Sequence, residues 1–209
     1  MKGKFITIEG VEGVGKSTQI ESIQQFLRDR NISFDLSREP GGTFYAEKIR
    51  QVLLEINDEN LDPTAELLLI FAARAQHLSN RIIPALDSGQ WVLCDRFTDA
   101  TYAYQGGGRE LGSSKVEQLE ILVQGALRPD LTIILDLDPE IGLERARDRA
   151  DLDRFEREEL EFFKRVRGVY LQRAQEFPQR YLVIDAAGSI DSVRDKLLRG
   201  FAEWIDANA

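Results

Sequence analysis

The chain has 209 residues, of which 43% are hydrophobic and 30% are charged, and its formal net charge at pH 7 is −9. The length suits one α/β domain of ordinary globular composition, and the acidic balance argues against broad nucleic-acid binding, which needs a basic surface. No apolar run approaches the roughly 20 residues that cross a bilayer, and the strand-like start would leave no room for a signal peptide. The single cysteine, Cys94, excludes an internal disulfide framework. We therefore expect a cytoplasmic protein that binds neither nucleic acid nor a membrane.

Residues 10–17, with the sequence GVEGVGKS, match the pattern G-x-x-x-x-G-K-[ST] of a phosphate-binding P-loop. The apolar segment 4–8 before the loop predicts a strand, and residues 17–28 after it carry apolar side chains at helical spacing. The glycines allow backbone N–H groups to turn toward a polyphosphate, and the helix N-terminus adds a partial positive charge. Lys16 would reach the phosphates, and the hydroxyl of Ser17 could bind Mg²⁺. We therefore expect the chain to bind a nucleoside triphosphate.

Downstream of the P-loop, apolar segments alternate with amphipathic ones. We expect further strands at 32–36, 91–94, 131–137 and 181–184, and helices at 46–55, 63–88 and 113–127, from 139, from 162 and from 189. Pro84 is expected to break or restart the helix at 63–88. The charged stretch 145–157 has almost no apolar content and is expected to lie at the surface. Strands that alternate with helices predict a parallel sheet with helices on both of its faces.

Acidic residues follow two of the predicted buried strands and compete for a role as a magnesium ligand. Asp95 follows one of these strands, and Asp136 and Asp138 end the next one along the chain. We prefer Asp95 because Arg96 accompanies it and could lie beside a transferring phosphate. A plain polar strand end is the alternative interpretation.

Four arginines, Arg38, Arg50, Arg74 and Arg96, fall at predicted sheet edges or in buried helices. Burying a guanidinium without a partner costs free energy, so arginines that converge there imply an anionic ligand. Arginine can bind a phosphate through two hydrogen bonds at once. Ordinary ion pairs to acidic residues are the alternative for about two of the four.

The segment 98–109 is polar and aromatic, and it contains a glycine triplet. Its residues Thr101, Tyr104 and Gln105 combine aromatic faces with an amide that both donates and accepts hydrogen bonds. Such a set could read a base edge and crowd a sugar. Packing in the core is the alternative.

The charged stretch contains Arg145, Arg147 and Arg149. They form either a solvated face or part of a mobile lid that closes over a transferring phosphoryl group and excludes water. His77, the only histidine, is expected to be structural, and Cys94 is expected to be a small core residue.

Five motifs occur in an order that resembles the bacterial thymidylate kinases. They are IEGVEGVGKST at 8–18, REPGGT at 38–43, DRF at 95–97, AYQG at 103–106 and LDRFE at 152–156. Together they span essentially the whole chain, and the REPGG run with DRF and YQG is specific to that family. The resemblance implies the P-loop nucleoside monophosphate kinase fold, an α/β fold with a five-stranded parallel sheet and helices on both faces, as a single domain over 1–209 with a short lid near 145–157. It also implies transfer of the γ-phosphoryl group of ATP to dTMP, with Mg²⁺ as cofactor, dTDP and ADP as products, and a homodimer as the assembly.

The resemblance assigns roles to particular residues. The implied ATP-binding set is Gly10, Val11, Glu12, Gly13, Val14, Gly15, Lys16, Ser17, Thr18 and Ala187. The implied dTMP-binding set is Glu12, Arg38, Arg50, Ile70, Phe71, Arg74, Arg96, Thr101, Tyr104 and Gln105. Ser17 and Asp95 would hold Mg²⁺, and the residues implied to act in catalysis are Lys16, Arg96, Arg149 and Arg147.

Within the dTMP-binding set, the family's pattern separates the two ends of the nucleotide. Arg96, together with Arg38 and Arg50, would bind the monophosphate. Arg74 and Gln105 would read the polar edge of thymine, with Thr101 nearby.

The chain departs from the family at the position that stacks on thymine. The family commonly has a phenylalanine one helical turn before Arg74, where this chain has Ile70. Phe71 is the next residue, and it points about 100° away on an ideal helix. We expect Phe71 rather than Ile70 near the base. Among the other contacts, Glu12 would meet the 3′-hydroxyl region and Tyr104 would crowd the 2′ position, which disfavours ribonucleotides.

One subgroup of the family carries a catalytic arginine within the P-loop, at the position that Val14 occupies here. The chain therefore resembles the other subgroup, whose lid supplies the arginine. Arg149 is the first candidate and Arg147 the second.

Two other functions stay open on the residues alone. A kinase for another nucleoside monophosphate or for a deoxynucleoside would share these features, since Tyr104 and Gln105 argue against purines but do not exclude dUMP. A P-loop switch or regulatory ATPase would act through a partner and have no small-molecule acceptor, and the four arginines and the lid argue against it. ADP release with a panel of acceptors separates these functions.

Overall fold

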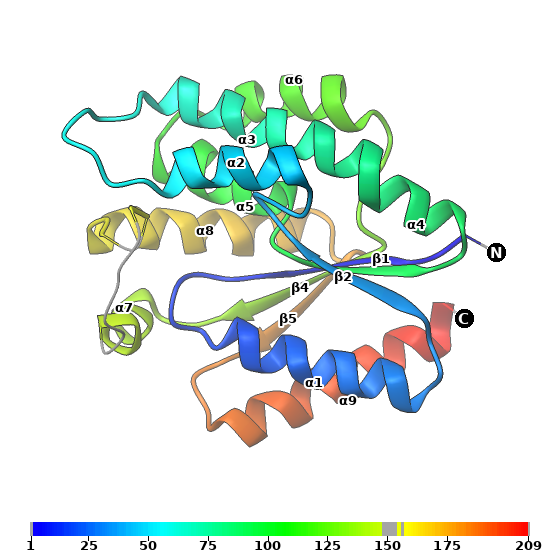
Figure 1. The fold of residues 1–209 in the computed structure, drawn as a ribbon. Helices are drawn as coiled ribbons and strands as arrows, with labels where there is room; N and C mark the ends of the chain where they lie inside the picture. The colour runs from blue at the N-terminus through cyan, green and yellow to red at the C-terminus, as the bar shows by residue number, and fades with distance from the viewer. Residues whose placement is uncertain (1, 148–153, 156, 209) are drawn as a thin grey trace.

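The computed structural model describes residues 2–147, 154–155 and 157–208. Among these residues, five strands form one sheet in the order β2-β3-β1-β4-β5, and every neighbouring pair is parallel. The strands are β1 (Phe5–Glu9), β2 (Phe34–Arg38), β3 (Trp91–Asp95), β4 (Leu131–Asp136) and β5 (Tyr181–Asp185). The predicted five-stranded parallel sheet is therefore confirmed (Figure 1).

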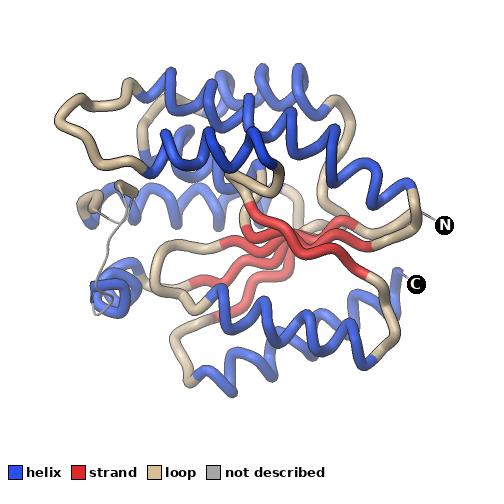
Figure 2. The backbone as a smooth tube through the Cα atoms, in the orientation of Figure 1, coloured by secondary structure: helices blue, strands red, loops and turns tan. Residues whose placement is uncertain are grey.

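Helices cover both faces of the sheet, as Figures 1 and 2 show. On one face, α1 (Lys16–Asp29) and α9 (Ile190–Asn208) pack against each other. The other elements are α2 (Phe44–Leu54), α3 (Pro63–His77), α4 (Ile83–Asp87), α5 (Thr98–Thr101), α6 (Ser113–Gln124), α7 (Pro139–Arg147) and α8 (Leu160–Glu176). Of these, α3, α4, α5, α6 and α8 lie on the opposite face, and α2 packs on α3. None of the helices in the described part of the chain is long and apolar enough to cross a membrane.

Two helical segments have wider, π-helical turns that the sequence analysis did not predict. The helix expected at 63–88 consists of α3, a π-helical turn at Leu78–Ile82 and then α4. Pro84 lies in the first turn of α4, where its missing N–H breaks no α-helical hydrogen bond, so the chain continues as a helix. The glycine triplet lies in a second π-helical segment, Tyr102–Gly108, which follows α5 directly. Apolar spacing identifies α-helices but carries no signal for these single wide turns.

The central strand β1 is buried along its whole length, and its alternation assigns side chains to the two faces. Ile6 and Ile8 belong to the core cluster that includes α1 and α9, whereas Phe5 belongs to the cluster beneath α4. Glu9 has the same parity as Phe5, and it forms hydrogen bonds with Phe97 and Tyr170. A carboxylate at the end of an apolar strand is thereby directed into the layer of α5 and α8.

Because all five strands are parallel, their carboxyl ends lie at one edge of the sheet. The P-loop follows β1, residues 38–43 follow β2, and residues 95–97 follow β3. Open α/β sheets bind ligands outside this edge, so the fold brings the polar motifs of the chain to one place.

Candidate active site

The turn between β1 and α1 has the backbone conformation that a P-loop requires. Gly15, the N-cap of α1, has a φ angle of 87°, in the left-handed region that favours glycine. Gly13 has a φ of 72°, and a Cβ on it would lie 1.9 Å from the carbonyl oxygen of Gly142 in α7. Because Gly15 has no side chain to cap α1, the N–H groups of the first helical turn are available to an anion.

A groove opens over the start of α1, and we call it the P-loop groove. It is lined by residues 12–19, Arg50, Asp95, Arg96, Arg145, Ala186, residues 188–190 and Val193. Burial lowers the pKa of Lys16, as does the charge of Arg96, while Glu12 and Asp95 act in the opposite direction. The groove therefore offers an ammonium group whose charge is only partly compensated by the protein.

Arg145 lines the P-loop groove although the sequence analysis placed it only in a charged stretch. It lies on α7, which the close approach of Gly13 and Gly142 holds against the P-loop. The amphipathic pattern of α7 does not reveal this neighbour, because the contact is made through backbone atoms.

A second cavity, here called the inner cavity, lies on the other side of the P-loop's acidic residue, Glu12. Eight of the expected dTMP-binding residues line it: Glu12, Arg50, Ile70, Arg74, Arg96, Thr101, Tyr104 and Gln105. The rest of its wall is Glu39, Pro40, Leu54, Phe97, Ala100 and Phe155. Charged and polar side chains thus line this cavity together with apolar ones, and polar groups that converge in this way can orient a small molecule.

Glu12, Arg50 and Arg96 line both cavities, so the two meet at these side chains. The Arg96 guanidinium contacts a carboxylate oxygen of Glu12 at 2.5 Å and lies 4.7 Å from the centre of the Tyr104 ring. The Tyr104 hydroxyl donates to the same carboxylate oxygen at 3.0 Å, and Arg50 donates to the carbonyl of Pro40 at 2.9 Å. Anionic ligands in the two cavities would therefore meet beside two arginines.

The backbone at Arg96 is held in an unusual conformation. Its φ angle is 66°, in the left-handed region that a non-glycine residue rarely adopts. The N–H of Arg96 donates to the carbonyl of Ile8 at 3.0 Å. The carbonyl of Arg96 accepts a hydrogen bond from the Cys94 thiol at 3.1 Å. Cys94 is fully buried, as expected of a core residue, and it also helps to fix the direction in which Arg96 leaves the sheet.

Glu9 lies beneath Arg96, and the sequence analysis did not single it out. Its carboxylate accepts hydrogen bonds from the backbone N–H of Phe97 at 2.7 Å and from the Tyr170 hydroxyl at 2.8 Å. The same hydroxyl accepts from Arg96 at 3.5 Å. Burial, and then the charge of Asp99, raise the pKa of Glu9 to about 8. The sequence carried one signal that could have identified Glu9, namely an acidic residue at the end of an otherwise apolar strand.

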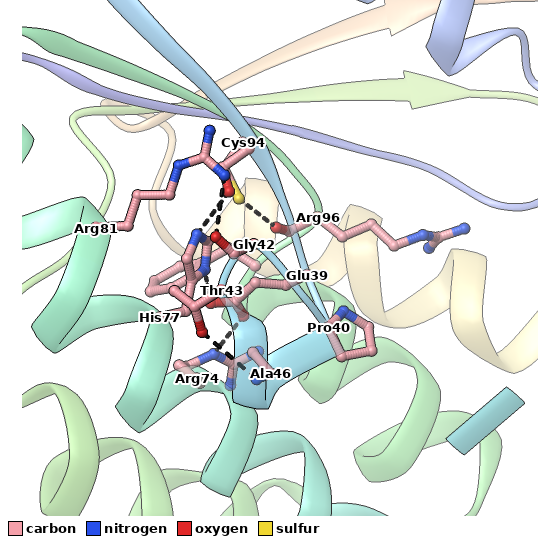
Figure 3. Close-up of polar contacts among 12 residues, drawn as sticks. Glu39, Pro40, Gly42, Thr43, Ala46, Arg74, His77, Arg81, Cys94 and Arg96 are labelled. Carbon is pink, nitrogen blue, oxygen red and sulfur yellow. Dashed lines mark hydrogen bonds and ion pairs between the residues drawn. The ribbon is translucent and has the colours of Figure 1, made fainter. Parts of the chain in front are cut away.

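At the far end of the inner cavity, the Arg74 guanidinium is almost entirely buried, with 1% of its side chain exposed. Its Nε donates to Glu39 at 2.7 Å and its Nη2 to the Thr101 hydroxyl at 2.9 Å, while its plane lies between the rings of Phe71 and Phe97 (Figure 3 labels Arg74 and Glu39). Its Nη1 is buried and has no hydrogen-bond partner among the described residues. A buried donor of this kind needs an acceptor, which a ligand can supply.

Glu66 is a second functional residue that the sequence analysis missed. It is fully buried on α3, accepts a hydrogen bond from Gln105 at 2.7 Å and forms ion pairs with Arg109 at 3.3 Å and Arg154 at 2.7 Å. Phe155, next to Arg154, lines the inner cavity. Glu66 therefore links one wall of the cavity to the part of the expected lid that contains Arg154 and Phe155.

Comparison with known proteins places this geometry in a family. The family model described as "Thymidylate kinase" matches residues 8–197. The chain belongs to the thymidylate kinase family. It is similar to the thymidylate kinase of Teredinibacter turnerae, at 55% identity over 98% of this chain and 100% of the relative. It is also similar to those of Pseudomonas putida strain F1, at 56% identity over 97% and 98%, and of Hahella chejuensis, at 51% over 96% and 97%.

Arg38 does not lie where the thymidylate kinase pattern led us to expect it. Its side chain is half exposed, forms an ion pair with Glu47 at 2.9 Å, and lines a separate groove with Ser17 and Asp95. Glu47 is in turn fixed by the backbone N–H of Gly42 at 2.8 Å. Of the three arginines expected to bind the monophosphate, Arg50 and Arg96 therefore lie at the junction of the two cavities, and Arg38 lines neither of them.

Of Ile70 and Phe71, only Ile70 lines the inner cavity. Phe71 instead belongs to a core cluster with Leu67 and stacks beneath the Arg74 guanidinium. The helix α3 is regular here, so the 100° between consecutive residues directs the phenylalanine away from the cavity. On the ATP side, the residues on either side of Ala187 line the P-loop groove, but Ala187 itself does not.

Of the acidic residues considered for magnesium, Asp95 has the more suitable surroundings. It lines the P-loop groove with Ser17, and its buried Oδ1 has no hydrogen-bond partner among the described residues. Asp136 forms two hydrogen bonds with Arg167, at 2.7 and 3.0 Å, and Asp138 caps the start of α7. The described residues include no cluster of three or more acidic, histidine or cysteine side chains that could hold a metal alone.

The lid candidates fall largely outside what the structure describes. Arg149 lies outside the described residues, as do Leu152, Asp153 and Glu156 of the LDRFE motif and the side chain of Arg147.

The raised pKa of Glu9 predicts a dependence of stability on pH. The carboxyl binds its proton more tightly in the folded protein, where its pKa is about 8, than in the unfolded chain, where it is near 4.5. Its contribution to the free energy of unfolding is therefore complete below pH 4.5 and is lost as the pH rises through 8. Between pH 5 and 8.5, the wild type should lose stability relative to Glu9→Gln, as measured by urea unfolding at each pH. Glu161→Gln, at an exposed carboxylate, should parallel the wild type, and a Glu9→Gln curve that does so as well would contradict the prediction.

Proposed function

We propose that this protein transfers the γ-phosphoryl group of ATP to dTMP, giving dTDP and ADP. The observation that carries the proposal is the meeting of the P-loop groove and the inner cavity at Glu12, Arg50 and Arg96. ATP in the groove and dTMP in the cavity would present their phosphates to each other at this junction. Family membership over nearly the whole chain supports the same two substrates.

Phosphoryl transfer requires positioning and charge stabilisation more than covalent chemistry from the protein. The first turn of α1 and Lys16 would hold the phosphates of ATP. Arg96, fixed by Glu12 and by the backbone of β1, would orient the dTMP phosphate with Arg50. That phosphate is already ionised, so the step needs no general base.

The inner cavity supports recognition of thymine and of deoxyribose. The free Nη1 of Arg74 would donate to a carbonyl on the base, and Ile70 would contact its ring. Tyr104, held to Glu12 by its hydroxyl, would occupy space next to the sugar's 2′ position. Glu12 would approach the 3′-hydroxyl.

Ser17 and Asp95 would hold Mg²⁺ in the P-loop groove. Mg²⁺ in such sites keeps several waters and binds through one or two carboxylates together with substrate phosphates, which suits the buried, unpartnered oxygen of Asp95. The ion would supply neutralisation of charge on the β- and γ-phosphates.

Residues 1–209 would form one kinase domain, with a lid near 145–157 that supplies the catalytic arginine. One argument is that Val14 stands where one subgroup of the family has its catalytic arginine, so the arginine has to come from elsewhere. The other is that α7, at the start of the proposed lid, contributes Arg145 to the P-loop groove. Arg149 is the first candidate and Arg147 the second, and Arg145, which lines the P-loop groove, would face the phosphates of ATP.

The assembly would be a homodimer that buries the outer face of α3 and α6. These helices pack against each other and expose Leu68, Ile121 and Leu122, the last with 78% of its surface exposed. Large apolar side chains gathered on one face of two neighbouring helices are typical of an interface.

The proposed activity predicts a specific pattern of acceptors. With ATP and Mg²⁺, dTMP should raise ADP release many-fold over background, dUMP less, and dCMP, dGMP, thymidine and ribothymidine monophosphate little. A coupled ADP assay over this panel measures it. A flat panel with slow background hydrolysis would refute the kinase and favour a switch ATPase.

A lid arginine that stabilises the transition state predicts a selective loss of turnover. Arg149→Ala should lower kcat by about 100-fold or more while changing the Kd for dTMP less than about threefold. Stopped-flow or steady-state kinetics, with calorimetry for binding, measure the two effects. Arg157→Ala, in the same charged stretch, is the matched control. If Arg149→Ala weakens binding and leaves kcat intact, Arg149 is not the transition-state arginine.

The proposed interface predicts that a charge on α6 separates the subunits. Leu122→Glu should convert a homodimer into a monomer in sedimentation velocity, because a carboxylate would have to be buried in the interface. Glu203→Lys, at an exposed position of α9 on the opposite face of the sheet, should leave the dimer intact. Dimers that persist at micromolar concentration in Leu122→Glu would place the interface elsewhere.

A further inference from the structure

A chain of buried polar side chains runs from Ser37 through His77 and Glu39 to Arg74. We propose that this chain is a positioning device, in which His77 holds Glu39 so that Arg74 presents one N–H edge to the base and selects a carbonyl at its position 4. The inference rests on the proposed function and deepens it, since it concerns how Ser37 and His77, which do not line the inner cavity, position Arg74, which does.

The contacts are short and shielded from water. His77 Nδ1 lies 2.9 Å from Glu39 Oε1, and His77 Nε2 lies 2.7 Å from the Ser37 hydroxyl. The second carboxylate oxygen of Glu39 accepts from Arg74 Nε at 2.7 Å (Figure 3). Each of these four residues has less than a tenth of its surface exposed. In such surroundings an unmade hydrogen bond is costly, so the partners restrict one another's orientation.

The chemistry of the groups fixes the direction of each hydrogen bond. A carboxylate accepts only, so His77 Nδ1 carries a proton and donates it to Glu39. In the neutral ring, Nε2 then accepts from the Ser37 hydroxyl. Both oxygens of Glu39 are thus engaged, one by the ring and one by the guanidinium, and the carboxylate cannot rotate without losing one of them.

The local sequence explains why these groups meet. Arg74 and His77 are three residues apart near the end of α3, so they lie on the same side of that helix. Ser37 and Glu39 are two residues apart in extended chain at the end of β2, so they also share a side. Gly42 leaves room for the cluster, since a Cβ there would lie 2.5 Å from both His77 Nε2 and the Ser37 oxygen.

The consequence for Arg74 is that a single edge remains available. Its Nε is bonded to Glu39, its Nη2 to Thr101, and its faces are covered by Phe71 and Phe97. The buried Nη1 is left without a partner among the described residues, on a side chain that lines the inner cavity. Guanidinium nitrogens only donate, so this edge favours a carbonyl acceptor over an amino group. Uracil and thymine carry a carbonyl at position 4, whereas cytosine carries an amino group.

Two substitutions of His77 separate positioning from simple support of the core. An asparagine amide nitrogen lies about as far along the side chain as His Nδ1, and can donate as Nδ1 does, whereas a glutamine amide oxygen lies about as far as His Nε2 and can accept as Nε2 does. His77→Asn therefore retains the donor to Glu39 and loses Ser37, whereas His77→Gln retains Ser37 and loses Glu39. Both leave a comparable defect in packing, and differential scanning fluorimetry would record it.

The measurement is the ratio of kcat/KM for dUMP to that for dCMP, two acceptors that differ at position 4 of the base and in the proton on the adjacent N3. His77→Gln should lower this ratio by about tenfold and raise KM for dUMP more than it changes kcat, because the loss follows from a misdirected charged donor. His77→Asn should keep the ratio within about threefold of the wild type. Equal ratios in the two variants, whether high or low, would overturn the positioning role.

Glu39→Asp gives a second test if His77→Gln does not fold. The shortened carboxylate keeps its charge but cannot reach both His77 and Arg74, and it should lower the ratio in the same way. A wild-type ratio in Glu39→Asp would overturn the inference. A wild type that releases no ADP in response to dTMP would overturn the proposed function and this inference together, whereas normal dTMP kinase activity with no effect on the ratio would overturn the inference alone.

Discussion

The geometry that the rest of the site depends on is the parallel pairing of all five strands. It brings the carboxyl end of every strand to one edge, and with these ends come Glu9, Arg38, Asp95, Asp136 and Asp185. Ionisable side chains crowded at one edge of a sheet destabilise the fold unless they find hydrogen-bond or ionic partners. The surrounding helices supply the partners: α8 contributes Arg167 to Asp136 and Tyr170 to Glu9, and α2 contributes Glu47 to Arg38.

These pairings divide the edge into structural and binding regions. Where a residue on a helix forms hydrogen bonds with every oxygen of a carboxylate, as Arg167 does with Asp136, that carboxylate has a structural role. Where a buried polar atom is left without a partner in the described part of the chain, as at Asp95 Oδ1 and Arg74 Nη1, a ligand can complete the set. The two unpartnered atoms lie at opposite ends of the site, on either side of the junction at Arg96.

Much of this arrangement could be predicted from the sequence, because its signals are local. The P-loop is a contiguous pattern, and strands that alternate with helices predict the parallel sheet. The predicted positions of Arg50, Arg74 and Arg96, at sheet edges or in buried helices, led us to expect one shared site, and all three line the inner cavity. The same reasoning did not predict the position of the Arg38 side chain, because its direction depends on an ion pair with Glu47, a residue on another element.

The remaining site residues depend on tertiary contacts that no local pattern carries. Glu9 and Glu66 look like ordinary acidic residues until the fold buries them, and Arg145 becomes part of the groove only through a backbone contact between Gly142 and the P-loop. Phe71 was expected beside the base because its ring suits stacking, but regular helical geometry turns that ring under Arg74. His77 was correctly expected to be structural, yet its two hydrogen bonds could not be inferred without the position of β2.

The contact between Glu12 and Arg96 has a consequence for the order of events at the junction. The carboxylate of Glu12 pairs with the Arg96 guanidinium, the same group that we propose orients the dTMP phosphate. When an anion arrives, Arg96 therefore exchanges one negative partner for another. Binding of the anion gains only the difference between the two interaction energies. The same exchange assists departure, because Glu12 can take back the guanidinium as the phosphate leaves. A carboxylate within the P-loop would thus keep a strongly charged product from remaining bound.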